Sequence, residues 1–281
     1  MDLVMVVGAG QMGSGIAQVA AQAGRRVAVY DVAQPFLDRG RAAVQGSLAR
    51  LVKREKLSAA EAEAALGRIE FRLDLEPARE ADLVVEAIVE RYEEKAELWR
   101  RVSELASESA VLATNTSSLP VTRLAANVRR PERFVGMHFM NPVPVMQLVE
   151  VVVGLATSEE TVLAVETEAQ AYGKTTVRAR DFPGFVSNRV LMPLINEAVF
   201  ALYEGVASVE DIDTVMRLGM NHPMGPLQLA DFIGLDTCLY ILEVLQEGFG
   251  DPKYRPCPLL RQYVQAGRLG RKSGRGFYTY G

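Results

Sequence analysis

Residues 3–31, LVMVVGAGQMGSGIAQVAAQAGRRVAVYD, contain the pattern that is most informative about the fold class. It opens with a continuous apolar run that stops at a glycine, as strands buried on both faces of a parallel sheet do. Gly8, Gly10 and Gly13 then form a G-x-G-x-x-G pattern ahead of a helical segment. Asp31 closes the next apolar run. This order of strand, glycine turn, helix and acidic residue predicts a dinucleotide-binding βαβ unit.

Each part of this pattern has a physical reason. The first glycine permits a tight turn, the second lets backbone N–H groups approach a diphosphate, and the third lets helix and strand pack closely. Asp31 can accept a hydrogen bond from a ribose 2′-hydroxyl and repel a 2′-phosphate, which predicts NAD rather than NADP. The alternative is a glycine turn that only packs the strand against the helix. The loop residues predicted to bind the cofactor are Gly8, Gly10, Gln11, Met12 and Gly13.

Apolar runs separated by helix-length segments continue along the chain after residue 31. VAVYD (27–31), ADLVVEAIVE (81–90) and SAVLATN (109–115) are predicted strands of the same sheet. A longer segment at about 34–67 is rich in alanine, leucine and charge, and is predicted to form a helical excursion that projects from the sheet. This alternation is typical of an α/β fold with a Rossmann-type, doubly wound sheet.

The pattern changes after residue 115. FVGMHFM (134–140) and QLVEVVV (147–153) flank a connector with two prolines, and we expect an antiparallel pair at the edge of the sheet. A helix at 158–172 and a strand at 174–178 are predicted to close this domain.

Proline and glycine occur together in DFPGF (181–185), which indicates a domain boundary. Beyond it the chain is predicted to be helical, with helices inside 185–203, 208–216, 226–247 and 258–266. The prediction is therefore an NAD-binding Rossmann-type domain at 1–182, followed by a smaller all-α C-terminal domain at 183–281 that serves the substrate and dimerisation.

Composition excludes several classes of protein. Thirty-one basic and 35 acidic side chains give a net charge of −4, which argues against a broad nucleic-acid or anionic-membrane surface. Cys238 and Cys257 have no metal-site or disulfide spacing, so no metal is predicted. No export signal and no membrane-length apolar run are recognisable, so we expect a cytoplasmic protein with no membrane or nucleic-acid partner.

Only two histidines, His138 and His222, are available for proton transfer. His138 lies in an apolar run and could be a core histidine. Glu150, twelve residues on, could lie against the imidazole across the paired strands, where it would orient the ring and stabilise its protonated form. His222 lies in MNHPMGP, and a structural role in a turn is expected.

Polar side chains follow the strand at 109–115 and the domain boundary. Ser117 and Ser118 come at the carboxyl end of a strand, where open α/β sheets bind ligands, although they could equally cap a helix before Pro120. Asn188 could hydrogen-bond a substrate oxygen or cap the helix that it begins. Sequence spacing leaves these alternatives open.

The ordered motifs VGAGQMGSGIA, LVVEAIVE, ATNTSSL, GMHFMNPVPVMQLVEVV, DFPGFVSNR, GVASVEDID, HPMGP and GRKSGRGFY cover nearly the whole chain. In these motifs the chain resembles the NAD-dependent L-3-hydroxyacyl-CoA dehydrogenase family. The resemblance implies reversible oxidation of a (3S)-3-hydroxyacyl-CoA, expected to be the short-chain 3-hydroxybutyryl-CoA, to the 3-ketoacyl-CoA. It also implies a homodimer formed through the C-terminal domain and a place in fatty-acid β-oxidation or butanoate metabolism.

The same resemblance implies roles for matching residues. His138 is the implied general base, with Glu150 as its carboxylate partner, and Ser117 and Asn188 are implied to hydrogen-bond the reacting oxygen. The positions implied to contact NAD are Glu90, Lys95, Ser117, Asn141 and Lys272. The positions implied to contact coenzyme A are Ser47, Arg54 and Ser117, where arginine replaces the lysine more common in the family at position 54.

The residues themselves also indicate a coenzyme A site. Arg50, Lys53 and Arg54 are spaced to share one face of a helix in an otherwise acidic protein, and could meet phosphates. The alternative is a solvated charged face. Two other functions also remain open: a β-hydroxyacid dehydrogenase acting on free acids, and a non-catalytic dinucleotide-binding protein.

Overall fold

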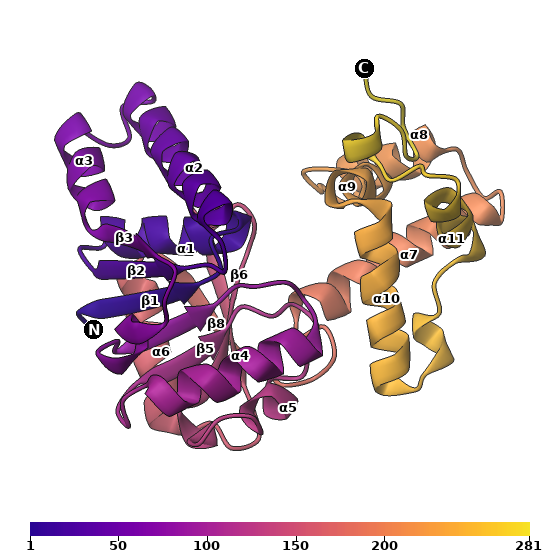
Figure 1. Cartoon of the computed structure of the whole chain (residues 1–281). Coiled ribbons are helices and arrows are strands. Elements are labelled where there is room, and N and C mark those ends of the chain that lie inside the picture. The colour runs from indigo at the N-terminus through magenta and orange to yellow at the C-terminus, as the bar shows by residue number, and fades with distance from the viewer. The chain divides into compact units, whose positions relative to one another are not determined.

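The N-terminal apolar run forms a central strand of an eight-stranded sheet in the computed structural model, which describes residues 1–281 (Figure 1). The strands are β1 (Leu3–Val7), β2 (Arg26–Tyr30), β3 (Ile69–Arg72), β4 (Leu83–Glu86), β5 (Val111–Thr114), β6 (Phe134–Phe139), β7 (Leu148–Val153) and β8 (Thr175–Arg180). Their order in the sheet is β3-β2-β1-β4-β5-β6-β7-β8. The chain reverses its direction of growth between β1 and β4, and the glycine loop follows β1 at this switch point.

Helices cover both faces of this sheet. They are α1 (Gln11–Gln22), α2 (Gln34–Lys53), α3 (Ala59–Gly67), α4 (Tyr92–Leu105), α5 (Val121–Ala125) and α6 (Glu159–Ala171). The apolar sides of α1, α2 and α6 share one core with alternate residues of the strands, while Trp99 of α4 packs edge-on against Phe134 on the opposite face. Burial on both faces explains why the central strands are apolar throughout.

The predicted antiparallel pair is confirmed, because β6 and β7 pair in antiparallel while all other neighbouring strands run parallel. Its predicted place at the edge of the sheet is wrong. β8 adds outside β7 in parallel, from Leu148 opposite Thr175 to Val153 opposite Arg180, and β8 is the edge strand. The last strand is longer than predicted because its backbone groups pair with the whole of β7.

Two further differences concern strands. β3 was not predicted, because IEFR is short and two of its four residues are charged, yet Val27 to Tyr30 of β2 pair with it. The predicted strand over 81–90 is wrong in length, since β4 ends at Glu86 and the chain then turns toward α4. The helical excursion is two helices, α2 and α3, with Ser58 and Glu61 forming a capping box at the start of α3.

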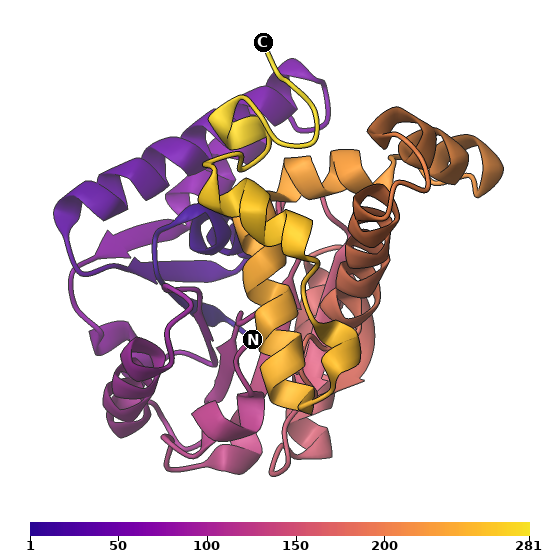
Figure 2. The same ribbon diagram turned by 90° about the vertical axis from the view of Figure 1, so that its right-hand side faces the viewer.

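The chain divides into two units, Met1–Phe182 and Pro183–Gly281; the second has two isolated β-bridges near its end, no strand of the sheet, and is built from helices. These are α7 (Ser187–Tyr203), α8 (Val209–Thr214), α9 (Pro226–Ile233), α10 (Leu235–Phe249) and α11 (Pro258–Gln265). Helices α7, α9, α10 and α11 share one apolar core. Figure 2 shows the ribbon of these helices from a second side. The predicted helical stretch 226–247 is interrupted at Gly234, whose φ of 105° favours glycine.

No helix in the chain combines the length and the apolar character that crossing a bilayer would require.

Candidate active site

The glycine loop between β1 and α1 has the geometry of a diphosphate cradle. Gly8 has a φ of 107°, and a Cβ on it would lie 2.6 Å from the carbonyl oxygen of Ala87. A Cβ on Gly13 would lie 1.8 Å from the carbonyl oxygen of Gly8, so only glycine lets α1 approach the loop this closely. Nothing lies within 4 Å of a Cβ built on Gly10, which leaves open space at the N-terminus of α1.

The residues present fit a dinucleotide. Gly10 is the N-cap of α1 and offers no side chain to its first-turn N–H groups, so these groups can bind an anion. Asp31 directly follows β2, and its two carboxylate oxygens accept hydrogen bonds from the backbone N–H groups of Ala9 at 2.8 Å and Val32 at 2.7 Å. The carboxylate is thereby fixed beside the glycine loop, with acceptor capacity left for a ribose hydroxyl.

A cavity of about 880 Å³ lies over this loop and is lined entirely by residues of the first unit. The predicted cofactor residues that line it are Gly8, Gly10, Gln11, Met12, Asp31 and Asn141. Asn141 also accepts a hydrogen bond from Gln11, with 3.0 Å between Oδ1 and Nε2. The connector after β6, which carries Asn141, therefore contacts the start of α1 beside the glycine loop.

Part of helix α2 borders the cavity, and the coenzyme A contacts predicted for this helix remain predictions. Ser47 and Arg50 line the cavity. Arg54, the C-cap residue of α2, is not among the residues that line it, and its contact with coenzyme A remains a prediction. Arg39 and Phe36 near the start of α2, which the sequence did not single out, line the cavity and contact each other, with the guanidinium carbon 4.7 Å from the ring centroid.

His138 and Glu150 form a buried pair. They are directly opposite in the register of β6 and β7, so their side chains lie on the same face of the sheet. His138 is 6% exposed and Glu150 is 1% exposed, and 2.8 Å separates Nδ1 from Oε2. A carboxylate can only accept, so Nδ1 carries the proton and Nε2 is the acceptor nitrogen in the neutral ring.

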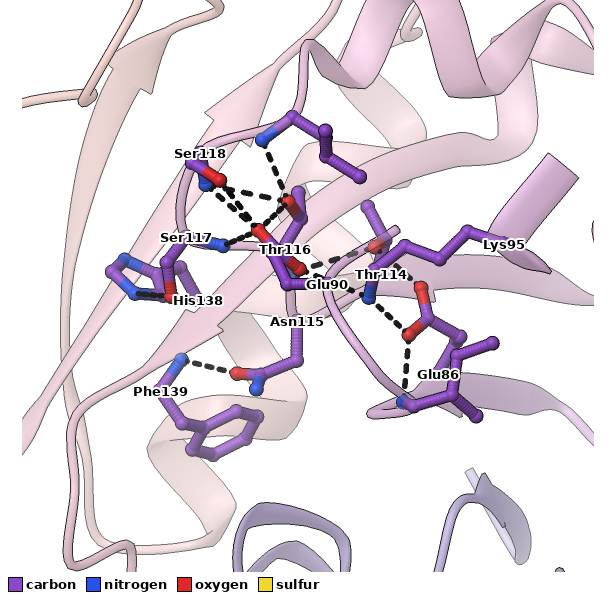
Figure 3. A network of polar contacts seen from close by, with 12 residues as sticks. Glu86, Glu90, Lys95, Thr114, Asn115, Thr116, Ser117, Ser118, His138 and Phe139 are labelled. Atoms are coloured by element: carbon purple, nitrogen blue, oxygen red, sulfur yellow. Dashed lines mark hydrogen bonds and ion pairs between the residues drawn. The ribbon is translucent and has the colours of Figure 1, made fainter. Parts of the chain in front are cut away.

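Ser117 contacts the ring nitrogen of His138 that faces away from Glu150. Its Oγ lies 3.0 Å from Nε2 of His138, as Figure 3 shows, and its hydroxyl is the donor when the ring is neutral. The capping alternative for Ser117 and Ser118 does not occur, because Asp181 accepts the N–H groups of Val121 and Thr122 at the start of α5. The hydroxyl of Ser117 therefore faces the imidazole.

Glu90 holds the loop that carries Ser117. Its Oε1 accepts the hydroxyl of Thr116 at 2.6 Å and the N–H groups of Ser117 at 2.8 Å and Ser118 at 3.0 Å (Figure 3). Burial alone would raise the pKa of Glu90. The nearby Lys95 ammonium and these hydrogen bonds together lower the pKa by more than burial raises it, so the pKa lies below its ordinary value. Glu90 therefore remains ionised at neutral pH and fixes the serine loop.

Lys95 is 1% exposed and lies beneath this loop rather than in the cavity. Its ammonium donates to Glu86 and lies 3.3 Å from Glu90. Glu86, which is fully buried at the end of β4, also accepts the hydroxyl of Thr114 at 2.7 Å. In this structure the side chains of Glu90 and Lys95 act on the serine loop, and their contacts with NAD remain predictions.

Two predicted site residues belong to the second unit. Asn188 lies in the first turn of α7. Lys272 lies in the C-terminal segment, where its ammonium is 2.6 Å from a carboxylate oxygen of Asp236 at the start of α10. His222 lies between α8 and α9, in the turn expected for it. The roles of Asn188 and Lys272 remain predictions.

Sequence reasoning missed Glu86 and Thr114 as part of the site. The sequence signal that could have revealed Glu86 is a carboxylate at the end of an apolar strand, because a buried charge at that position needs buried polar partners. It also missed Val143 and Pro144, which line the cavity from the β6–β7 connector.

A Rossmann-type sheet, a glycine-lined dinucleotide cavity and a buried histidine–carboxylate pair define an NAD-dependent dehydrogenase. Residues 3–182 match the model of the 3-hydroxyacyl-CoA dehydrogenase NAD binding domain, and residues 184–280 match that of the 3-hydroxyacyl-CoA dehydrogenase C-terminal domain. The chain belongs to the 3-hydroxyacyl-CoA dehydrogenase family.

Individual relatives agree with this membership. A probable 3-hydroxybutyryl-CoA dehydrogenase of Bacillus subtilis is 58% identical over 277 residues, which cover 99% of this chain and 96% of that protein. A 3-hydroxybutyryl-CoA dehydrogenase of Bradyrhizobium diazoefficiens is 51% identical, over 99% of this chain and 94% of that protein. The crystal structure of (S)-3-hydroxybutyryl-CoA dehydrogenase from Ralstonia eutropha superposes with a TM-score of 0.98 at 48% identity, covering 100% and 99% of the two chains.

Proposed function

We propose that the protein interconverts (3S)-3-hydroxyacyl-CoA and 3-ketoacyl-CoA thioesters with NAD, and that 3-hydroxybutyryl-CoA is its substrate. The observation that carries the proposal is the buried pair of His138 and Glu150 with the Ser117 hydroxyl on Nε2. The names of the relatives at 51% and 58% identity support the choice of substrate.

In the proposed reaction the protein transfers the proton, and the hydride passes to the cofactor. Bound NAD supplies the hydride acceptor. Nε2 of His138 takes the proton of the substrate hydroxyl in oxidation and returns it in reduction. Glu150 stabilises the imidazolium formed in this step, since its carboxylate lies 2.8 Å from Nδ1.

Two further side chains act on the reacting oxygen in this proposal. Ser117 has its hydroxyl 3.0 Å from Nε2, so an oxygen bound at that nitrogen is within reach of both groups. A hydrogen bond from Ser117 to the oxygen would polarise a ketone and contribute about 2–4 kcal/mol of transition-state stabilisation. Asn188 is proposed to add a second such hydrogen bond.

Substrate and cofactor choice test the proposal in one assay. Acetoacetyl-CoA should be reduced with NADH at a catalytic efficiency at least about 10²-fold above that for free acetoacetate or for NADPH, because Asp31 disfavours a 2′-phosphate. The measurement is the loss of nicotinamide absorbance. Preference for the free acid would favour a β-hydroxyacid dehydrogenase, and tight NADH binding without turnover of any thioester would favour a non-catalytic binding protein.

The second unit is proposed to form a homodimer. Large apolar side chains on its surface are exposed, which is unusual for a helical unit of this size unless another surface covers them. They include Val190, Tyr203, Leu218, Met220, Phe232 and Tyr240. Light scattering at micromolar concentration should give twice the 30.8 kDa chain mass, and a monomer would refute the proposal.

A further inference from the structure

Lys174 is a buried lysine with no acidic partner. It lies between α6 and β8, and only 7% of it is exposed. No carboxylate forms an ion pair with its ammonium, although the chain has 35 acidic side chains. Burial lowers the pKa of Lys174, which reflects the cost of keeping a charge in this position. Such a placement needs a compensating interaction.

The compensating partners are two backbone carbonyls of the connector between β6 and β7. The ammonium of Lys174 donates to the carbonyl oxygens of Val143 and Met146, the latter at 2.8 Å. The connector is also closed on itself, because the N–H groups of Val145 and Met146 both donate to Pro142 at 3.0 Å. The ammonium of Lys174 therefore stabilises this turn from its buried side. Hydrogen bonds donated by a charged group are stronger than those between neutral groups.

This connector is a wall of the dinucleotide cavity. Asn141, Pro142, Val143 and Pro144 line it. Val143 is buried against α1, since a Cβ on Gly15 would lie only 2.8 Å from that of Val143. The turn that Lys174 holds thus packs on the helix whose N-terminus borders the cavity.

We propose that Lys174 is a positioning residue for the cofactor: its buried ammonium holds the carbonyls of Val143 and Met146 so that the β6–β7 connector keeps the shape of the cavity wall. The inference rests on dinucleotide binding in the first unit, and does not depend on which acyl substrate is used. Dinucleotide affinity should therefore depend on a side chain that lines no part of the cavity.

Lys174→Met tests this directly, because methionine fills similar space and cannot donate. We expect the Kd for NADH, measured by nicotinamide fluorescence, to rise about tenfold, which corresponds to about 1.4 kcal/mol. The amides of Val145 and Met146 should exchange hydrogen faster in the free protein. At saturating NADH, kcat should stay within about threefold, since a loosened wall weakens binding more than chemistry.

Two matched controls separate positioning from general loosening. Lys56→Met removes an exposed lysine, and Val165→Ala opens a cavity in the buried face of α6; both should keep the Kd within about twofold. The proposal is overturned if Lys174→Met binds NADH as the unmodified protein does, or if Val165→Ala weakens binding equally. Should Lys174→Met fail to fold, Lys174→Gln keeps an amide donor and is expected to raise the Kd about threefold; an unchanged Kd in that variant would also overturn it.

Binding of NADH by the unmodified protein, measured in the same titration, tests the proposed function independently of Lys174.

Discussion

Replacing His138 with glutamine should lower kcat for acetoacetyl-CoA reduction by about 10³-fold, because the only acid–base group at the proposed reaction centre is lost. Glutamine can still hydrogen-bond Glu150 and Ser117 but cannot carry a proton between solvent and substrate. His138 does not line the dinucleotide cavity, so the Kd for NADH should stay nearly unchanged. Loss of nicotinamide absorbance gives kcat, and nicotinamide fluorescence gives the Kd.

His222 provides the matched control, since it is the other histidine of the chain and lies in a turn of the second unit. His222→Gln should retain nearly all activity. A His138→Gln variant with a kcat within about tenfold of the unmodified protein would show that another group moves the proton. A comparable loss in both variants would show that histidine replacement acts through stability.

The pairing of His138 with Glu150 could be predicted because it involves two strands that are neighbours in the sequence. Two apolar runs joined by a short connector pair in antiparallel, and residues at equal distances from the turn lie opposite each other. The connector's two prolines left the register uncertain, since they exclude a tight hairpin without defining its length. In the structure His138 lies directly opposite Glu150.

The contacts beneath Ser117 could not be predicted, because they join residues from three separate segments. Glu86 ends β4, Thr114 ends β5 and Lys95 lies in α4, so their contact depends on the order of strands in the sheet. Resemblance implied that Lys95 contacts the cofactor. That contact remains a prediction; in this structure Lys95 is 1% exposed and pairs with the carboxylates of Glu86 and Glu90.

Helix ends were the other source of error. Helical periodicity placed Arg50 and Arg54 on one face, and periodicity does not indicate where a helix stops. Helix α2 stops at Lys53, yet the N–H of Arg54 still donates to the carbonyl of Arg50 at 3.1 Å; Arg50 lines the cavity, and the coenzyme A contact of Arg54 remains a prediction. Similarly, the apolar pattern of 226–247 continues through Gly234, and only the backbone conformation of that glycine separates α9 from α10.

Replacing Glu150 with glutamine should lower kcat by about 10²-fold or more, with a nearly unchanged Kd for NADH. The amide is isosteric and can accept the proton of Nδ1, so the ring should keep its place between Glu150 and Ser117. What is lost is the negative charge, which at 1% exposure is weakly screened by water and stabilises the imidazolium. Steady-state assays of both directions should show the loss, because the same imidazolium forms in oxidation and donates in reduction.

Glu168 offers a control of the same chemistry, because it is also buried in the first unit, where it pairs with Arg25 at 2.8 Å. Glu168→Gln should lower the melting temperature and leave kcat near that of the unmodified protein, since Arg25 loses only a structural partner. If Glu150→Gln retained full activity, the carboxylate would be needed only to orient the ring. Equal losses of kcat in the two variants would mean that burying any neutral amide in this unit impairs turnover, and the charge argument would fail.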